Sequence, residues 1–447
     1  MKRYDFIAIG GGNAGLTAAA KIKAAGFKVA LIDKGAIGGL CSLNGCNPKK
    51  VFVRTTELLD EIRHAQKYGI DVETPRVDWA RVMARKESFT NPVTEQSIAS
   101  LKSQGIDLIS GAPRFTSTNT LTINDEEIEF GGVIISTGSK PRALNFTGAE
   151  FVKTTNDILA ISEVPKNLVV VGAGVVAYEF GQVFARLGSK VTILANSRAL
   201  SNEDADIVDA MVDFSKSLNV KTINHAKVKI IRKNGAELLV EYEAEGTAET
   251  LSADFILNAA GRVAAIDELD LSKAEVAVDK RGIVTNQFLR SATNPKIFAG
   301  GDAHGVLQLS PVASYEGRVV AKNFLENDAE PVNFEGIPRA IYTVPQLASV
   351  GLTEAEARKR NLDIAVTNSE MSDWKVYAII AGGQVAKAKV ITENSTGRIL
   401  GAHLFAMNAG DTINLYALAI RYGLKADDLR NMIFSYPTLA SALPFTI

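Results

Sequence analysis

Two cysteines, the only ones among 447 residues, lie close together at Cys41 and Cys46 in a glycine-rich segment, residues 38–50. Their spacing is about one and a half helical turns, so a helix that begins near Cys41 would let the two sulfur atoms approach bonding distance. The positive end of that helix would also lower a thiol pKa and favour the nucleophilic thiolate. The segment therefore predicts a redox-active pair, with buried filler as the alternative role for two free thiols.

The bulk composition gives no sign of a polymeric or membrane partner. Hydrophobic residues make up 46%, charged residues 22%, and the net charge is −1, so nothing attracts the chain to nucleic acid or an anionic membrane. The strand-like residues 6–9 follow the N-terminus directly, and no apolar run reaches the roughly 18 residues of a membrane span. We expect a cytoplasmic protein, in a compartment where a lone cysteine pair is more often redox-active than structural.

A tight turn between a strand and a helix precedes the cysteine segment. Residues 7–9 are strand-like and residues 16–22 are helix-like, and three glycines stand at the fingerprint spacing, Gly10, Gly12 and Gly15. These glycines permit the turn, the close approach of a pyrophosphate and the packing of helix on strand. Asp33 follows the next strand, about 20 residues on, where a carboxylate binds a ribose hydroxyl.

A second turn of the same kind follows the strand-like residues 168–171. It carries Gly172 and Gly174, and the third glycine is replaced by Ala177, which the fingerprint allows. The position equivalent to Asp33 holds Ala195, so the carboxylate that recognises NAD is missing. Three polar residues come next, Asn196, Ser197 and Arg198. They could hold a 2′-phosphate, which favours NADPH over NADH, unless Arg198 is only a solvated surface residue.

Five motifs in order resemble those of the pyridine nucleotide-disulfide oxidoreductases, the family of glutathione reductase, dihydrolipoamide dehydrogenase and mercuric reductase. They are residues 38–50, 135–141, 258–262, 297–302 and 344–354. Leu40 stands where the family usually has threonine, and Ala264-Ala265 replaces the common Pro-Asn.

This resemblance implies an α/β fold with two Rossmann-like dinucleotide-binding domains, one for FAD and one for NAD(P), and a C-terminal α+β dimerisation domain. The implied FAD domain is discontinuous, residues 1–144 and 267–330, and the NAD(P) domain comprises residues 145–266. Residues 331–447 would form the dimerisation domain of a homodimer.

The apolar patterns of the C-terminal region support that division. Residues 385–391 and 399–405 are strand-like, and the polar residues 393–398 form a turn between them. Residues 410–422 have apolar positions at helical spacing, which indicates core or a subunit interface.

The family's functional residues can be carried over to matching positions. By this analogy Cys46 is the sulfur next to the flavin, Cys41 exchanges with the acceptor, and either Lys49 or Lys50 pairs with Glu179, for which a surface ion pair is the alternative. The other residues implied to bind cofactors are Gly39, Thr137, Gly138, Asp302, Ser310, Gly261 and Arg262. We expect no resident metal.

One departure from the family limits the function. Disulfide reductases end in His-Pro-Thr-x-x-Glu, whereas this chain has Tyr436 and Ser441 at the two catalytic positions. A tyrosine with a pKa near 10 is a poor proton shuttle at neutral pH. Mercuric reductase shares the tyrosine but also carries a C-terminal cysteine pair, which is missing here. The remaining histidines are expected to be solvated or packed, His64, His225, His304 and His403.

The acceptor is therefore left open among a small disulfide, a metal ion and a quinone. Dihydrolipoamide dehydrogenase or glutathione reductase activity is one alternative. Direct transfer from flavin to quinone, oxygen or a second nicotinamide is another. A flavin-binding redox sensor with little turnover is the third.

Overall fold

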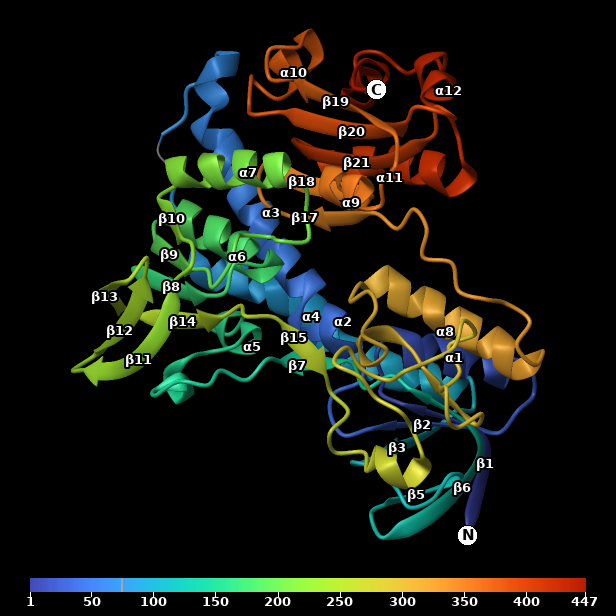
Figure 1. Ribbon diagram of the computed structural model, residues 1–447. Helices are drawn as coiled ribbons and strands as arrows, with labels where there is room; N and C mark the ends of the chain where they lie inside the picture. Colours follow the sequence, from blue (N-terminus) through green and yellow to red (C-terminus); the bar gives the residue numbers. More distant parts are fainter. Residues whose placement is uncertain (74) are drawn as a thin grey trace. The chain divides into compact units, whose positions relative to one another are not determined.

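The computed structural model describes residues 1–73 and 75–447 (Figure 1). The contacts within the chain define two compact units. Unit 1 consists of Met1–Lys49, Met83–Ala143 and Gly261–Asn333, and unit 2 of Lys50–Val82, Leu144–Ala260 and Phe334–Ile447. The predicted division into three domains stays a prediction. No helix in the described part of the chain combines the length and the apolar character needed to cross a membrane.

Unit 1 contains a sheet whose central strands are parallel. Its order is β3-β2-β1-β6, and β16 also pairs with β6. The strands are β1 Lys2–Ile9, β2 Val29–Asp33, β3 Asp107–Ser110, β6 Glu126–Ile135 and β16 Ile297–Ala299, with β5 Thr120–Ile123 and β4 Arg114–Phe115 extending the sheet in antiparallel fashion. The apolar runs in β1 and β2 are buried on both faces, as parallel strands require.

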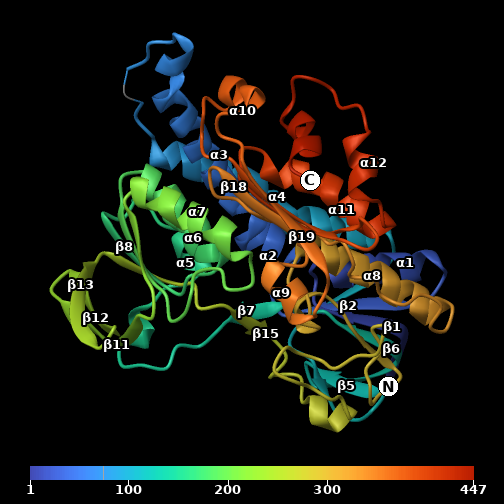
Figure 2. The same cartoon turned by 45° about the horizontal axis from the view of Figure 1, so that its top comes forward.

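Two helices of unit 1, α1 (Asn13–Ala24) and α8 (Ser310–Leu325), lie side by side (Figure 2). Their contact is close at Gly317, where a Cβ would lie 2.5 Å from the carbonyl oxygen of Ala14. Unit 1 also contains α2 Gly39–Asn44, the pair β7 Ser139–Pro141 and β15 Arg262–Ala264, and the 3-10 turns η3 Leu271–Ala274 and η4 Gly301–Ala303. Helices α3 (Cys46–Arg63) and α4 (Trp79–Ser103) continue from one unit into the other.

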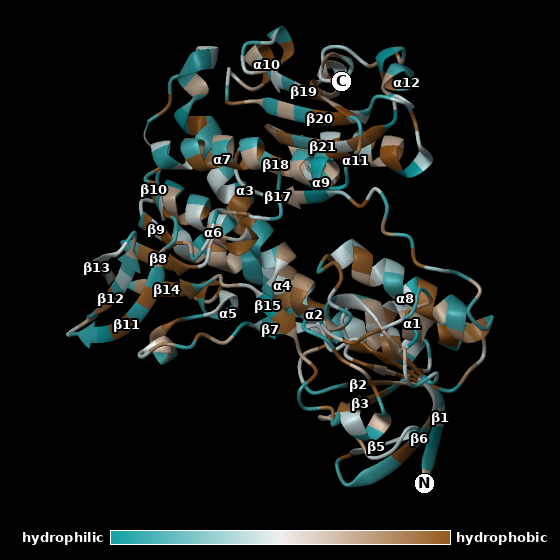
Figure 3. Cartoon of the chain, viewed as in Figure 1, coloured by the Kyte–Doolittle hydropathy of each residue, from teal (hydrophilic) through white to brown (hydrophobic). Residues whose placement is uncertain are grey.

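Unit 2 contains a second parallel sheet, in the order β10-β9-β8-β14. Its strands are β8 Asn167–Val171, β9 Lys190–Leu194, β10 Val220–Ile223 and β14 Phe255–Asn258, and its helices are α6 Val175–Arg186 and α7 Ala205–Ser217. Hydrophobic residues dominate β8 and β14 (Figure 3). An antiparallel meander follows, β11 Lys227–Asn234, β12 Glu237–Ala244 and β13 Thr247–Ala253. Two dinucleotide folds are thus present, as predicted.

The C-terminal part of unit 2 is a five-stranded antiparallel sheet with helices. Its order is β17-β18-β21-β20-β19, formed by Arg339–Ile341, Gln346–Gly351, Ile399–Ala406, Lys387–Glu393 and Ile364–Glu370. The helices are α9 Glu354–Lys359, α10 Lys375–Ile380, α11 Ala409–Tyr422 and α12 Ala426–Arg430, followed by the 3-10 segment η5 Leu439–Phe445. The two predicted strands and the predicted helix of this region are confirmed as β20, β21 and α11.

A buried lysine lies among acidic groups in unit 2. Lys389 on β20 is 2% exposed, and its Nζ lies 3.2 Å from Asp204 Oδ1, 2.6 Å from Asp206 Oδ2 and 2.7 Å from Glu354 Oε2. Burial alone would lower the pKa of Lys389, but the hydrogen bonds to Asp206 and Glu354 and the charge of Asp204 raise it above its ordinary value. Lys389 is therefore a cation whose burial depends on these partners.

We expect Lys389→Met to lower the free energy of unfolding by about 3–5 kcal/mol, because the change leaves the buried carboxylate of Asp204 without its cation. The matched control is Lys387→Met on the same strand. Its pair with Glu370 is 36% and 70% exposed, so the loss should stay below about 1 kcal/mol. Urea unfolding of both variants provides the measurement, and equal losses would contradict the special role of Lys389.

Candidate functional site

The first glycine turn in unit 1 is built from residues that admit no side chain. Gly10 has a φ of +108°, and a Cβ there would lie 2.3 Å from Ser136 O. A Cβ on Gly15 would lie 2.1 Å from Gly10 O. Asp33 at the end of β2 accepts hydrogen bonds from the backbone N–H of Gly11, at 2.6 Å, and of Gly35, at 2.7 Å. The carboxylate is thus fixed beside the turn, where the sequence places a ribose-binding acid.

A cavity of about 630 Å³, which includes space open to solvent, lies in front of this turn. Its lining includes Gly12, Gly39, Cys41, Cys46, Gly138, Asp302 and Ser310. A Cβ on Gly39 would lie 2.7 Å from Gly12 Cα, so two backbone segments approach each other closely at the cavity wall. The structure thus brings together most of the residues that the sequence assigns to an FAD site.

Polar residues connect the walls of this cavity. Ser139 Oγ donates to Asp302 Oδ2 at 2.5 Å and accepts from Arg262 Nε at 2.8 Å. Asn13 Nδ2, at the start of α1, donates to Ser310 Oγ, at the start of α8. The hydroxyl of Thr137 is buried and has no hydrogen-bond partner among the described residues. An orphaned hydroxyl, a fixed carboxylate and glycine walls fit a bound dinucleotide such as FAD.

The two thiols lie on successive helices rather than on one. α2 ends at Asn44, Gly45 separates the two helices, and Cys46 opens α3. This differs from the single helix that the spacing suggested. Both cysteines are in the thiol form, with Cys41 partly buried and Cys46 exposed. The hydrogen bond from Cys46 lowers the pKa of Cys41 to about 6, and a further bond from Ser310 and the charge of Lys49 act in the same direction against burial.

Glu179 and Lys50 are close to each other in unit 2. Glu179, on α6, is 1% exposed, and its Oε1 lies 3.7 Å from Lys50 Nζ. The same oxygen accepts a hydrogen bond from the backbone N–H of Tyr342 at 2.7 Å, and the Lys50 ammonium lies over the ring of Tyr342. The structure thus brings Lys50, one of the two candidate lysines, close to Glu179.

The second glycine turn, in unit 2, repeats the geometry of the first. Gly172 has a φ of +104°, and a Cβ there would lie 2.4 Å from Ala259 O. Gly174 caps α6, and Ala177 is fully buried at the third position. Ala195 follows β9 and is buried, and the three polar residues after it are exposed, Asn196, Ser197 and Arg198.

Arg198 already has partners in unit 2. Its Nη2 donates to Ala205 O and to Asp209 Oδ1, both at 2.7 Å. The side chains of this pair are 42% and 65% exposed, so water screens the interaction and a competing anion can replace Asp209. The predicted binding of a 2′-phosphate by Arg198 stays a prediction.

Three further residues that the sequence assigns to the site are Tyr436, Gly261 and Arg262. Tyr436 is 66% exposed. Gly261, with a φ of +101°, precedes Arg262 at the start of β15. Among the described residues, no group of three or more His, Cys, Asp and Glu side chains is arranged to hold a metal ion.

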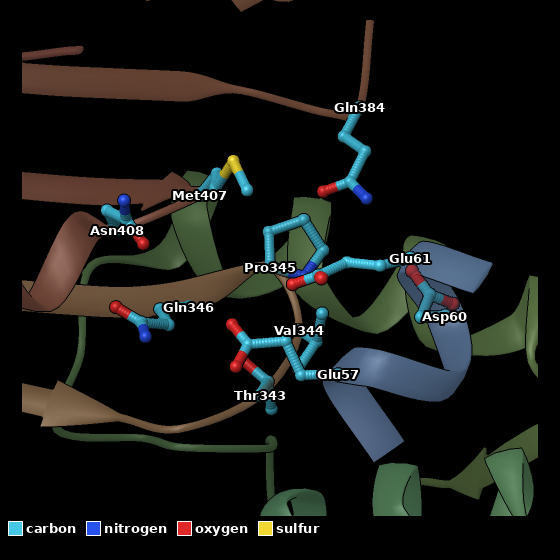
Figure 4. A pocket seen from close by; sticks show the side chains of 10 residues that line it. All are labelled: Glu57, Asp60, Glu61, Thr343, Val344, Pro345, Gln346, Gln384, Met407 and Asn408. Carbon is cyan, nitrogen blue, oxygen red and sulfur yellow. The ribbon is translucent and has the colours of Figure 1, made fainter. Parts of the chain in front are cut away.

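A second cavity, of about 320 Å³, lies within unit 2 (Figure 4). Its lining consists of carboxylates from α3, residues at the start of β18, Gln384 and residues that follow β21. These are Glu57, Asp60, Glu61, Thr343, Val344, Pro345, Gln346, Gln384, Met407 and Asn408. These carboxylates are already paired: Arg54 bridges Glu57 and Glu61, and Asp60 binds the buried Arg186. We therefore assign no ligand to this cavity.

Sequence reasoning missed several residues that shape the site. Asn13, Ser136 and Ser139 lie inside motifs that were recognised, but their polar contacts join segments far apart in the chain. Ser136 Oγ donates to Ile9 O and Gly10 O, at 2.9 and 3.2 Å. A small polar residue beside a fingerprint glycine is the only local signal for such contacts.

Comparisons with known proteins agree with this geometry. The protein-family model of the pyridine nucleotide-disulphide oxidoreductases matches residues 4–317 of this chain. The family model of the corresponding dimerisation domain matches residues 337–445. A mercuric reductase of Staphylococcus aureus is 30% identical over 445 residues, which cover 98% of this chain and 81% of that protein. A dihydrolipoyl dehydrogenase of Bacillus subtilis (strain 168) is 31% identical over 449 residues, covering 97% and 94%.

Solved structures show the same fold over the full length. The HOCl-induced flavoprotein disulfide reductase RclA from Escherichia coli, as its Cu(II) complex, matches with a TM-score of 0.89 at 28% identity. The match covers 100% of this chain and 99% of that one.

We predict that the alkylation of Cys41 by iodoacetamide in the reduced protein follows a midpoint near pH 6, since its pKa is lowered to about 6. The thiolate is the nucleophile, so the rate should fall as the pH drops through this value and stay level above it. Cys46→Ala removes the main hydrogen bond and should move the midpoint toward the ordinary value of about 8.5. Peptide mass spectrometry measures the modification, and a wild-type midpoint above 8 would contradict the prediction.

Proposed function

This chain belongs to the pyridine nucleotide-disulphide oxidoreductase family, and we propose that it is an FAD-dependent NAD(P)H oxidoreductase whose Cys41/Cys46 pair reduces a small-molecule acceptor. Members of the family are oxidoreductases and flavoproteins, and this chain is one of them. One observation carries the proposal: the low-pKa thiol of Cys41 and its neighbour Cys46 line the same cavity as the glycine cradle of a dinucleotide site.

The residues of unit 1 suit FAD by their chemistry. Bound FAD supplies two-electron transfer between a nicotinamide and a disulfide. The backbone at Gly12 and Gly39 leaves room for a pyrophosphate, the carboxylate of Asp33 suits a ribose hydroxyl, and Thr137 offers an unpaired hydroxyl. Asp302, held by Ser139, would accept hydrogen bonds from the ribityl and phosphate region.

The thiols would act in a fixed order on a disulfide acceptor. The Cys41 thiolate attacks one sulfur atom of the acceptor, which forms a mixed disulfide and releases the first thiolate. Cys46 then attacks the Cys41 sulfur, releases the second thiolate and closes the Cys41–Cys46 disulfide. NAD(P)H restores the dithiol by giving up a hydride, so that NAD(P)H and one proton from solvent together supply the two electrons and two protons of the two product thiols. Lys50, paired with Glu179, is the lysine that we assign to the flavin's reactive nitrogen.

The acceptor is proposed to be a small disulfide, a metal ion or a quinone. A metal ion is supported by the mercuric reductases among the relatives and by the Cu(II) complex of RclA. Such an ion would be a substrate that meets Cys41 and Cys46 themselves. Dihydrolipoamide dehydrogenase or glutathione reductase activity is a second candidate, supported by the dihydrolipoyl dehydrogenase relatives, with Tyr436 in place of the acid–base histidine.

We further propose a homodimer in the cytoplasm. The dimerisation-domain match supports the dimer, and large apolar side chains lie exposed within that region, including Leu418, Tyr422, Ile433 and Phe445 at 53%, 73%, 95% and 74%. A cytoplasmic thiol pool would keep a cysteine pair of this kind reducible.

NADPH is the proposed coenzyme. Ala195 lacks the carboxylate that binds the ribose of NADH, and the guanidinium of Arg198 lies three residues further on. An incoming 2′-phosphate would compete with Asp209 for that guanidinium.

Replacement of either cysteine by serine should lower the turnover of a disulfide acceptor by about 100-fold or more, because both sulfur atoms are needed for exchange. Cys46→Ser should also abolish the long-wavelength absorbance that a thiolate next to a flavin gives on reduction. Glutathione disulfide, lipoamide, Cu(II), Hg(II) and quinones are assayed in parallel, with Ser42→Ala as the matched control. Wild-type turnover of the best acceptor by Cys46→Ser would show that the disulfide is not used.

Arg198→Ala should lower kcat/KM for NADPH by about tenfold or more and leave NADH within about twofold, since only NADPH carries the 2′-phosphate. Asp209→Asn is the counterpart, because it removes the competing carboxylate and should raise kcat/KM for NADPH. Steady-state kinetics with both coenzymes test this, and a clear wild-type preference for NADH would overturn the assignment.

A further inference from the structure

Glu316 on α8 is a carboxylate that is almost completely buried in unit 1. It is 1% exposed, and its Oε2 accepts a hydrogen bond from the backbone N–H of Gly301 at 2.6 Å. Its Oε1 lies 2.9 Å from Nδ1 of the buried His304. The other ring nitrogen of His304 lies 3.1 Å from Thr285 Oγ1. The two carboxylate oxygens thus have separate partners.

Burial of a carboxylate is costly unless hydrogen bonds and an opposite charge replace its water. Both partners of Glu316 come from one short segment, the η4 turn Gly301–Ala303 and the residue that follows it. Gly301 has a φ of +66°, a left-handed conformation that glycine adopts without strain. The buried carboxylate therefore favours one position of this turn over all others.

The same turn presents Asp302 to the cavity in front of the first glycine turn, and both Gly301 and Asp302 line that cavity. α8, which carries Glu316, also opens with Ser310 in the cavity wall and packs on α1 through Gly317. One side chain thus connects three segments that surround the cavity: the η4 turn, α8 and, through the adjacent packing, α1.

We propose that Glu316, oriented by His304, is a positioning residue for flavin binding, which holds the Gly301–Asp302 turn where Asp302 can meet the cofactor. This inference rests on the proposed function, because it takes FAD as the occupant of the cavity. Glu316 does not line the cavity, so it acts through the turn and not by contact with the flavin.

The test measures the dissociation of FAD from purified holoprotein by the fluorescence of the released flavin. Glu316→Ala should weaken FAD binding by about 10- to 100-fold, the range expected for loss of a buried hydrogen bond to a charged group. Glu316→Gln keeps an acceptor for the Gly301 N–H and should restore binding to within about threefold of wild type. Glu330→Ala is the matched control. The side chain of Glu330 pairs with Lys322 of α8 at the surface, so this variant should bind FAD as the wild type does.

The melting temperature of each protein without FAD is measured as well. It separates an effect of the substitution on FAD binding from an effect on the stability of the whole fold. Unchanged FAD affinity in Glu316→Ala, whatever its melting temperature, would overturn the proposal. If that variant does not fold, His304→Phe takes its place, with about fivefold weaker FAD binding expected and wild-type affinity overturning the inference. A wild-type protein that binds no flavin would instead overturn the proposed function itself.

Discussion

The close approach of the backbone at Gly12 and Gly39 is the constraint on which the candidate site depends. A Cβ on Gly39 would lie 2.7 Å from Gly12 Cα, so any side chain there would push α2 away from the glycine turn. α2 carries Cys41, and α3 begins with Cys46. The position of both thiols relative to the dinucleotide cradle therefore depends on the absence of a side chain at Gly39.

Buried charges give the fold its second set of constraints. Glu179, Glu316 and Lys389 are each at most 2% exposed, and each has an oppositely charged or hydrogen-bonding partner from a distant segment. Such groups add little net stability compared with apolar residues, but they penalise arrangements that separate them from their partners. One of them, Glu316, lies next to the Gly301–Asp302 turn that we assign to the flavin site, where the accuracy of positioning matters most.

The sequence predicted the parts of this structure that depend on local pattern. Alternation and apolar runs located β20, β21 and α11, and the fingerprint glycines located both dinucleotide turns. It did not predict that Gly45, with φ −136° and ψ −114°, would separate α2 from α3, because a glycine can adopt many backbone conformations and its residue type does not choose among them. Glu316 and His304 were also missed as a pair. Their contact depends on the packing of α8 against the η4 turn, which no spacing along the chain reveals.

The lowered thiol pKa offers a physical reason why Tyr436 can replace a histidine. In related disulfide reductases the histidine acts as acid and base toward the substrate thiol. The pKa of Cys41 is lowered to about 6, so its thiol ionises more readily at neutral pH than an ordinary cysteine. In the proposed mechanism, the hydrogen bonds from Cys46 and Ser310 would therefore favour the attacking thiolate of Cys41 without a histidine. Only protonation of the leaving group still needs help, and acceptors that need none, such as metal ions, would lose least by the exchange of histidine for tyrosine.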